Sequence, residues 1–276
     1  MVGDDASFHM DILPALPEDQ GYKMFLEARR LSTDWSDTAL AITDREDRNF
    51  ENISNYWPRS NPKGFAKWFV SKMGTEYHRQ KRVLYEKNKG SGLHASVEDV
   101  PDYKIRTPLQ SAVMILKRHR DMMFEEAPDD KPISIIISTL AAHAYNGEDD
   151  TGDALGTILG NFTSYIEHQD GKCVITNPSD PLENFADKWE ARPERQEAFF
   201  SWVSQCQTDF GNMFALNDFG EIAKLLETGL GEKVTDKVLS KGPRRPRLLK
   251  EAQVASTTTF SFPAAAREPK KPKGFA

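Results

Sequence analysis

Apolar residues at helical spacing predict a long helix between Ser60 and about Glu86. They recur three or four residues apart along one face, at Phe65, Trp68, Phe69 and Met73. Ser60-Asn61-Pro62 precedes them, and a capping residue followed by proline is typical of a helix start. The segment Lys87 to Asp102 holds two glycines and a proline. We therefore interpret it as a loop.

Two further helices are predicted in the middle of the chain. Thr107-Pro108-Leu109-Gln110 has the pattern of a capping box with proline at the first helical position. The apolar stripe that follows is Leu109, Val113, Leu116 and Met123. Pro132 opens the next helix, Ile133 to Tyr145, which is apolar almost all round. Such a helix is expected to be buried on all sides.

The rest of the second half alternates loops with helices. Asn146 to Asp153 is polar and is interpreted as a loop, and Lys172 to Ile175 as a short strand. The further helices that we predict are Leu155 to Ile166, Glu194 to Leu216 and Asp218 to Leu226. From Lys241 onward proline, charged and hydroxyl residues dominate, which predicts a disordered tail.

The chain opens on a strand pattern. Ser7 to Leu13 alternates apolar and polar positions until Pro14 and Pro17 end it. A lone strand would leave two unpaired edges, which sheet proteins normally cover. We therefore expect the chain to begin partway through a sheet. Gly21 to Asn52 is polar and poorly periodic, and we interpret it as irregular structure beside that sheet.

Composition excludes some functions. A net charge of −6 over 276 residues disfavours a general electrostatic grip on nucleic acid. No apolar run approaches the roughly 20 residues that a membrane span needs, and no secretory signal pattern opens the chain. Cys173 and Cys206 lack metal-ligand spacing, so we interpret both as buried or incidental thiols. We expect a cytoplasmic protein.

Three ordered segments carry a resemblance to a known family. They are Phe8 to Ala15 (FHMDILPA); Arg106 to Arg120 (RTPLQSAVMILKRHR), with Pro132 to Ser138 (PISIIIS); and Asn177 to Pro181 (NPSDP), with Glu183 to Ala186 (ENFA). In this order they resemble bacterial relatives of cyclic GMP–AMP synthase and oligoadenylate synthetase. Those relatives are the nucleotidyltransferases of cyclic-oligonucleotide anti-phage defence. The resemblance covers roughly residues 5 to 230.

The resemblance implies two-metal chemistry. Enzymes of this family join ATP, GTP or other NTPs by attack of a ribose hydroxyl on an α-phosphate, with two Mg²⁺ ions on the attacking and leaving oxygens. Three carboxylates hold the ions, and Asp11 matches the third of them. Asp11 would then be both a catalytic and a metal-binding residue. The plainer alternative is a strand-end aspartate that faces water. His9, on the same face, is interpreted as structural.

The resemblance also implies two nucleotide-binding residues. Lys117 matches a helix lysine that points at the donor triphosphate, although it could instead lie on a solvated helix face. Ser134 matches a position near the phosphates at a helix start, where anions are favoured, although it could be a plain helix-start serine. Asn177 to Pro181 resembles an Asp-Pro-x-Asp-Pro loop with asparagine for the first acid. We interpret that loop as structural.

The family's other two carboxylates, in a D-x-D or E-x-D pair after a Gly-Ser helix start, have no match in the chain. There is no D-x-D, and Gly90-Ser91 and Glu148-x-Asp150 both stand in the wrong context. One carboxylate cannot hold two Mg²⁺ ions. We therefore expect that this chain lacks the first half of the site and does not catalyse nucleotide transfer alone. A truncated or split gene or a misassigned start would explain it.

The expected fold is α+β: the C-terminal part of a nucleotidyltransferase sheet with a mainly helical C-terminal domain. Residues 1–60 would be the sheet remnant, 61–240 the helical wall of the nucleotide cleft, and 241–276 a disordered basic tail. The expected product of the intact enzyme is a cyclic di- or trinucleotide. A catalytically inactive nucleotide-binding or regulatory module is the alternative, and a maker of linear oligonucleotides is a third.

The tail that ends at Ala276 admits two interpretations. It is either a solvated basic tail or, as the resemblance suggests, a substrate for an enzyme of the ubiquitin-transfer type.

Overall fold

The computed structural model describes residues 14–18, 20–42, 57–91 and 96–215. The expected strand at Ser7 to Leu13, with Asp11, lies outside the described residues, as do the expected helix at Asp218 to Leu226 and the tail from Lys241. The described chain divides into two compact units, which are taken one at a time below. The first holds the residues up to Phe69 together with Thr176–Glu183, and the second holds Val70–Ile175 and the chain from Asn184.

The first unit joins a small sheet to helix α1 (Gln20–Ala28). Its three antiparallel strands are β1 (Ala15–Pro17), β2 (Leu40–Ile42) and β3 (Arg59–Ser60), with β2 in the centre. Segment Thr176–Glu183 adds β6 (Thr176–Asn177) and most of β7 (Asp180–Asn184). The buried apolar side chains of α1 and its surroundings are Tyr22, Leu26 and Ala39, with Leu31 packed against them.

Helix α1 corrects the expectation of irregular structure between Gly21 and Asn52. Only Tyr22 and Leu26 of this helix are buried, and they stand one turn apart. Tyr22, Phe25 and Leu26 do stand at helical spacing, but the segment is only nine residues long. Two of its apolar side chains, Met24 and Phe25, are exposed, so the pattern is a short signal within a polar stretch. The helix is stabilised by tertiary packing, which local sequence does not reveal.

Helix α2 (Pro62–Asn88) begins where the sequence predicts. The Asn61 Oδ1 atom accepts a hydrogen bond from the Gly64 amide at 2.9 Å, so asparagine caps the first turn and proline follows it. Asn61 also accepts from the Thr38 hydroxyl and donates to the carbonyl oxygens of Trp35 and Ser179. All four hydrogen-bonding positions of this buried amide are therefore occupied.

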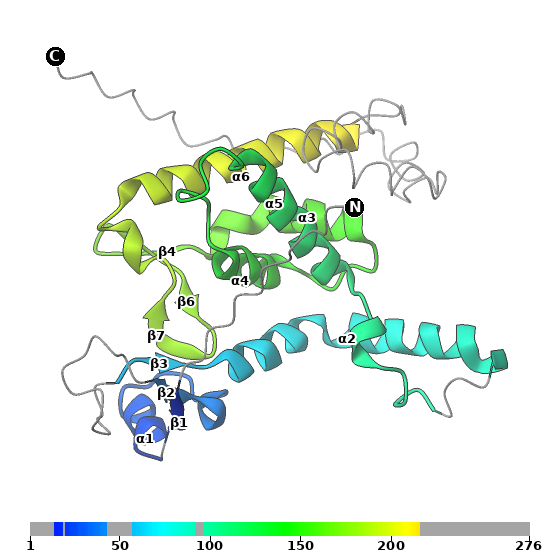
Figure 1. Cartoon of the computed structure of the whole chain (residues 1–276), viewed down its shortest axis with the longest axis horizontal. Helices are drawn as coiled ribbons and strands as arrows, with labels where there is room; N and C mark the ends of the chain where they lie inside the picture. Colours follow the sequence, from blue (N-terminus) through cyan, green and yellow to red (C-terminus); the bar gives the residue numbers. More distant parts are fainter. Residues whose placement is uncertain (1–13, 19, 43–56, 92–95, 216–276) are drawn as a thin grey trace, which may run out of the picture. The chain divides into compact units, whose positions relative to one another are not determined.

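The second unit is mainly helical (Figure 1). Its long helices after α2 are α3 (Pro108–Met123), α4 (Ser134–Ala144), α5 (Thr151–Asn161) and α6 (Pro193–Ala215). A two-stranded antiparallel sheet joins β4 (Glu167–Gln169) to β5 (Lys172–Val174). The largest fully buried side chains of this unit come from these helices, the turn after α5 and the residue after β5: Leu109, Leu116, Ile136, Ile137, Leu140, Ile158, Leu159, Phe162, Ile175, Phe199 and Trp202.

Short 3₁₀ turns complete the described chain. They are η1 (Ser36–Thr38), η2 (Lys89–Ser91), η3 (Asp102–Lys104), η4 (Phe162–Tyr165) and η5 (Asp187–Trp189).

Several predicted boundaries of the second unit are confirmed. The Thr107 hydroxyl accepts from the Gln110 amide and the Gln110 side chain accepts from the Thr107 amide, which is the expected capping box. Helix α4 is buried on every side after its first turn. The predicted bounds of the next helix, Leu155 to Ile166, are wrong: α5 runs from Thr151 to Asn161, and it starts early because the Asp150 carboxylate accepts from two first-turn amides. The predicted polar loop therefore contains the helix cap.

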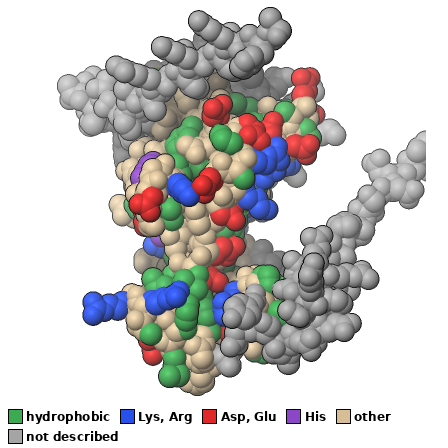
Figure 2. Space-filling view, turned by 90° about the vertical axis from the view of Figure 1, so that its left-hand side faces the viewer, with side chains coloured by type: hydrophobic (Ala, Val, Ile, Leu, Met, Phe, Trp, Pro, Cys, Tyr) green, Lys and Arg blue, Asp and Glu red, His purple; other side chains and the backbone are tan. Residues whose placement is uncertain are grey.

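The described residues include no helix that combines the length and the apolar character needed to cross a membrane. Cys173 and Cys206 are both free and buried, as predicted. On the face of the described residues drawn in Figure 2, acidic and basic side chains are interspersed.

Candidate functional site

The sequence Lys117 to Asp121 (KRHRD) on α3 supplies side chains to two sides of that helix. Lys117 is half-buried. Burial, and then the nearby charge of Arg120, hold the pKa of its ammonium group below the ordinary value. Its Nζ atom has no hydrogen bond or ion pair with any residue that the structure describes. A half-buried ammonium group in this state is stabilised by any anion that reaches it.

Arg120 is 5% exposed, and each of its three guanidinium nitrogens donates a hydrogen bond. One of its terminal nitrogens, Nη1, donates to the Pro132 carbonyl at 2.8 Å and to the Ser134 Oγ at 2.9 Å. The other side of the guanidinium donates to the Asp121 Oδ1, through Nε at 3.1 Å and Nη2 at 2.7 Å. Arg120 therefore joins the end of α3 to the start of α4, and the Asp121 carboxylate compensates its buried charge.

Ser134 is the first residue of α4 and is exposed. The residue before it, Ile133, offers no side-chain acceptor for the first-turn amides. Such a helix start presents N–H groups and the positive end of the helix dipole to an anion. The structure thus brings Ser134 to Arg120, three residues from Lys117. Asp11, the third residue expected at the site, lies outside the described part of the chain.

On another side of α3, His119 contacts α6. Its Nε2 lies 2.9 Å from the Asp209 Oδ2, and its Nδ1 lies 3.3 Å from the Cys206 Sγ. A Cys-His-Asp order resembles a nucleophile, base and orienting acid. However, Cys206 is completely buried, and burial raises the pKa of its thiol well above the ordinary value. A protonated, inaccessible thiol is not a nucleophile, so these contacts serve to hold α6 against α3.

The segment Asn177 to Pro181 forms a turn between β6 and β7 in the first unit. The Asn177 side chain accepts from the amide and the hydroxyl of Ser179. Asp180 is 3% exposed and accepts from the Tyr22 hydroxyl and the Leu182 amide. The segment is therefore a structural turn whose polar groups are bonded within the fold, in agreement with its interpretation from the sequence.

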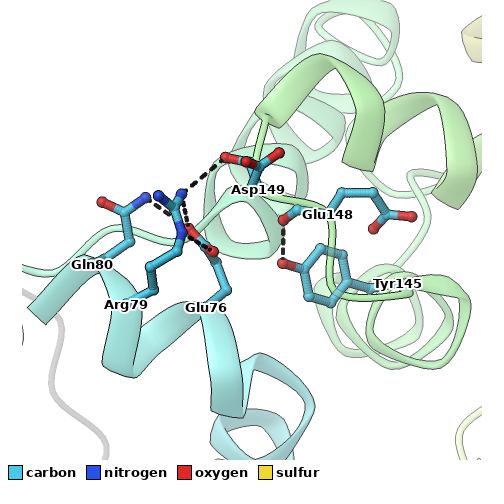
Figure 3. Close-up of polar contacts among 6 residues, drawn as sticks. All are labelled: Glu76, Arg79, Gln80, Tyr145, Glu148 and Asp149. Atoms are coloured by element: carbon cyan, nitrogen blue, oxygen red, sulfur yellow. Dashed lines mark hydrogen bonds and ion pairs between the residues drawn. The ribbon is translucent and has the colours of Figure 1, made fainter. Parts of the chain in front are cut away.

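A second polar cluster lies between α2 and the loop before α5 (Figure 3). The buried Glu76 carboxylate accepts from both the Arg79 guanidinium and the Gln80 amide at 2.6–2.7 Å. Figure 3 shows Arg79 directed toward Asp149, whose carbonyl it reaches at 3.5 Å. Arg79 and Gln80 therefore compensate the buried Glu76 carboxylate, and Arg79 also holds the loop that contains Asp149.

The fit of these residues to a metal is poor. Across residues 14–18, 20–42, 57–91 and 96–215, no three His, Cys, Asp or Glu side chains are grouped so that they could hold a metal ion. Glu148 and Asp150, which stand at an E-x-D spacing, accept backbone amides instead. Magnesium binding through Asp11 stays a prediction.

The sequence did not predict the role of Arg120 in the corner, by which we mean Lys117 and Arg120 of α3 together with Ser134 at the start of α4. The neighbours of Arg120 in the KRHR run are a half-buried lysine and an exposed arginine, and nothing in one sequence separates the buried cation from them. The signal that could have revealed it is spacing, because Arg120 follows Leu116 by one turn and so falls on the apolar stripe of the helix.

The chain is similar in sequence to two bacterial proteins. No family model matches it. It is 27% identical over 226 residues to a c-di-GMP synthase of Roseivirga ehrenbergii, covering 81% of this chain and 52% of that protein. It is 30% identical over 149 residues to the cyclic dinucleotide synthase CdnG of Bradyrhizobium diazoefficiens, covering 49% of this chain and 34% of that one. The chain thus spans about half or less of the length of these relatives.

A solved structure shares the fold. The CD-NTase CdnG of Bradyrhizobium diazoefficiens, solved in complex with GTP, matches with a TM-score of 0.50 at 21% identity. The match covers 67% of this chain and 56% of that one. The described chain is mixed helix and strand, in agreement with the expected α+β fold class. The sequence matches agree with the resemblance expected from the motifs: this chain is similar to bacterial proteins named as cyclic dinucleotide synthases.

Proposed function

We propose that this chain is part of an enzyme that joins two guanosine triphosphates into a cyclic dinucleotide. In this proposal the start of α4 and Lys117 bind the triphosphate. The observation that carries it is the corner where Arg120 joins Ser134 to α3, three residues from the half-buried Lys117. The choice of guanine is supported by the relatives, one named c-di-GMP synthase and one solved with GTP.

The corner offers an anion three kinds of contact. The Lys117 ammonium group is a mobile point charge whose burial is compensated by a phosphate. The Ser134 hydroxyl lies at an exposed helix start and can donate a hydrogen bond. The first amides of α4 have no side-chain cap and point toward the same end of the helix. These groups bind and orient a triphosphate, and they supply neither a nucleophile nor a base.

The wider expectations are part of the same proposal. Transfer would need Mg²⁺, with Asp11 among its ligands. A role in anti-phage defence and an enzyme of the ubiquitin-transfer type acting on Ala276 are also proposed from the family resemblance. Because the chain spans only part of its relatives' length, catalysis is proposed for the whole protein.

Binding of a fluorescent GTP analogue, followed by anisotropy, tests the nucleotide site. Lys117→Ala is expected to weaken binding about tenfold or more, since it removes a charged contact to phosphate. Lys188→Ala is the matched control, because it removes the same charge from an exposed lysine elsewhere in the second unit, and it should leave affinity unchanged. Equal losses in the two variants would count against a specific phosphate site.

Product analysis separates the alternatives. The full-length protein is incubated with GTP and Mg²⁺, and the products are resolved by chromatography and mass spectrometry. A cyclic product supports the synthase, and a linear one supports an oligonucleotide polymerase. Binding that depends on Lys117 with no product from the full-length protein supports the catalytically inactive nucleotide-binding module.

A further inference from the structure

We propose that Arg120 is a positioning residue that orients the Ser134 hydroxyl so that its proton faces a bound phosphate. The inference rests on the proposed nucleotide site and extends it to a residue that never touches the ligand.

The contacts of Arg120 limit it to this role. Three of its nitrogens donate to protein acceptors: Nε and Nη2 to the Asp121 carboxylate, and Nη1 to the Pro132 carbonyl and the Ser134 Oγ. With 5% of its surface exposed, the guanidinium cannot itself reach a ligand in solvent. The Asp121 carboxylate compensates its charge, so Arg120 is held in place without an external anion.

The hydrogen bond from Arg120 determines what the Ser134 hydroxyl can do. A serine hydroxyl carries one donor and two acceptor positions, and its proton rotates to suit its partners. The Arg120 Nη1 occupies an acceptor position at 2.9 Å. The hydroxyl proton must then point away from the guanidinium. A charged donor also polarises the hydroxyl and strengthens the hydrogen bond that it gives in turn.

The Ser134 hydroxyl donates to no acceptor in the part of the chain that the structure describes. A serine in the first turn of a helix often bonds to nearby backbone groups. Here the Ser134 carbonyl accepts from the Ser138 hydroxyl at 2.9 Å, and Arg120 already bonds the Pro132 carbonyl just before the helix. Ser134 itself is exposed. Its proton is therefore free to donate to a phosphate oxygen from solvent.

A double-mutant cycle on nucleotide affinity tests this coupling. The variants are Arg120→Met, Ser134→Ala and the two combined, with fluorescent GTP as the probe. Each single change is expected to weaken GTP binding about tenfold, while the double variant should bind no worse than Ser134→Ala alone. Arg118→Met is the control, because it removes the same charge from the neighbouring exposed position. Ser134→Thr keeps the hydroxyl and should retain most of the affinity.

The outcomes are distinguishable. If Arg120→Met weakens GTP equally with and without the Ser134 hydroxyl, Arg120 does not act through Ser134 and the inference is overturned. If the chain with its natural residues binds no GTP, the proposed function itself fails. Should Arg120→Met unfold, as thermal melting would show, Arg120→Lys replaces it in the same cycle. Lysine keeps the positive charge but lacks the several N–H groups of the guanidinium. It should therefore lose the hydrogen bond to the Ser134 Oγ, and GTP affinity should change as it does for Arg120→Met.

Discussion

Tyr22 donates a hydrogen bond of 2.7 Å to Asp180, which follows it by 158 positions in the chain. Both side chains are buried in the first unit. This bond, with that of Asn61 to the Ser179 carbonyl, fixes the β6–β7 turn to α1 and to the start of α2. The pKa of Tyr22 is raised by its burial and by the carboxylate that it faces, which keeps the hydroxyl protonated as a donor.

Tyr22→Phe is expected to destabilise the fold by about 1–3 kcal/mol. The change leaves the buried Asp180 carboxylate without its shortest donor, and an unsatisfied buried acceptor costs its desolvation energy. Tyr165→Phe, the same change at an exposed tyrosine, should be within about 0.5 kcal/mol of the natural protein. Urea unfolding of the two variants measures the difference. Equal stabilities would show that the Tyr22 bond contributes nothing.

Gly64→Ala and Gly74→Ala on α2 should have opposite signs. A Cβ at Gly64 would lie 2.4–2.6 Å from the side-chain atoms of Asn61, whereas one at Gly74 meets nothing within 4 Å. Asn61 cannot move without breaking its buried hydrogen bonds. We expect Gly64→Ala to destabilise by about 1–3 kcal/mol. Gly74→Ala should stabilise by about 0.5–1 kcal/mol, because alanine favours a helix interior. Thermal unfolding checks both, and a stabilised Gly64→Ala variant would show that the cap is adaptable.

The predictability of the fold depended on where its signals lie. Helix starts that carry their own caps, at Asn61 and Thr107, were recognised because the capping residue, the proline and the apolar stripe are local. Helix α1 was missed because Tyr22 is buried against residues distant in sequence. The Tyr22–Asp180 bond has no local signal at all, since any polar turn could follow β6. Long-range pairing of this kind is visible only in three dimensions.

The residues of the candidate site likewise divide into those that the sequence predicted and those that only the structure reveals. Lys117 and Ser134 were selected by motif resemblance, and the structure places both beside Arg120. The part played by Arg120 follows from its burial, which the run of cations around it conceals. His119 likewise gives no sequence signal for its pairing with Asp209, which lies 90 positions away. Asp11, the metal ligand predicted from the resemblance, falls outside the described residues.

The Cys206 thiol is expected to be unreactive in the folded chain. It is completely buried beside His119, and burial raises its pKa, so almost no accessible thiolate exists at neutral pH. In a Cys173→Ala variant, a thiol-specific reagent such as Ellman's should react with Cys206 only after denaturant is added. Rapid labelling of the native variant would mean that α6 separates readily from α3.

His143 should make the stability of the second unit depend on acidity. Its ring stacks on Tyr165 with centroids 5.4 Å apart. Burial, and then the charge of Lys72, lower its pKa from 6.5 to about 4. Between these values the unfolded chain binds a proton that the folded chain does not, so stability rises with pH across this window. Acidification through it therefore removes stability that is fully present above pH 6.5.

His143→Phe keeps an aromatic ring on Tyr165 and removes the titration. The loss of stability between pH 7 and pH 4.5 should then be smaller by about 1–2 kcal/mol, a value reduced because the half-buried ring is partly screened by water. Urea unfolding at the two pH values measures this difference, which cancels the packing change made by phenylalanine itself. His78→Phe, at an exposed histidine of α2, controls for the loss of one histidine. If both variants lose stability on acidification as steeply as the natural chain, His143 is not the group whose protonation opposes the fold, and the acid sensitivity must come from the buried carboxylates instead.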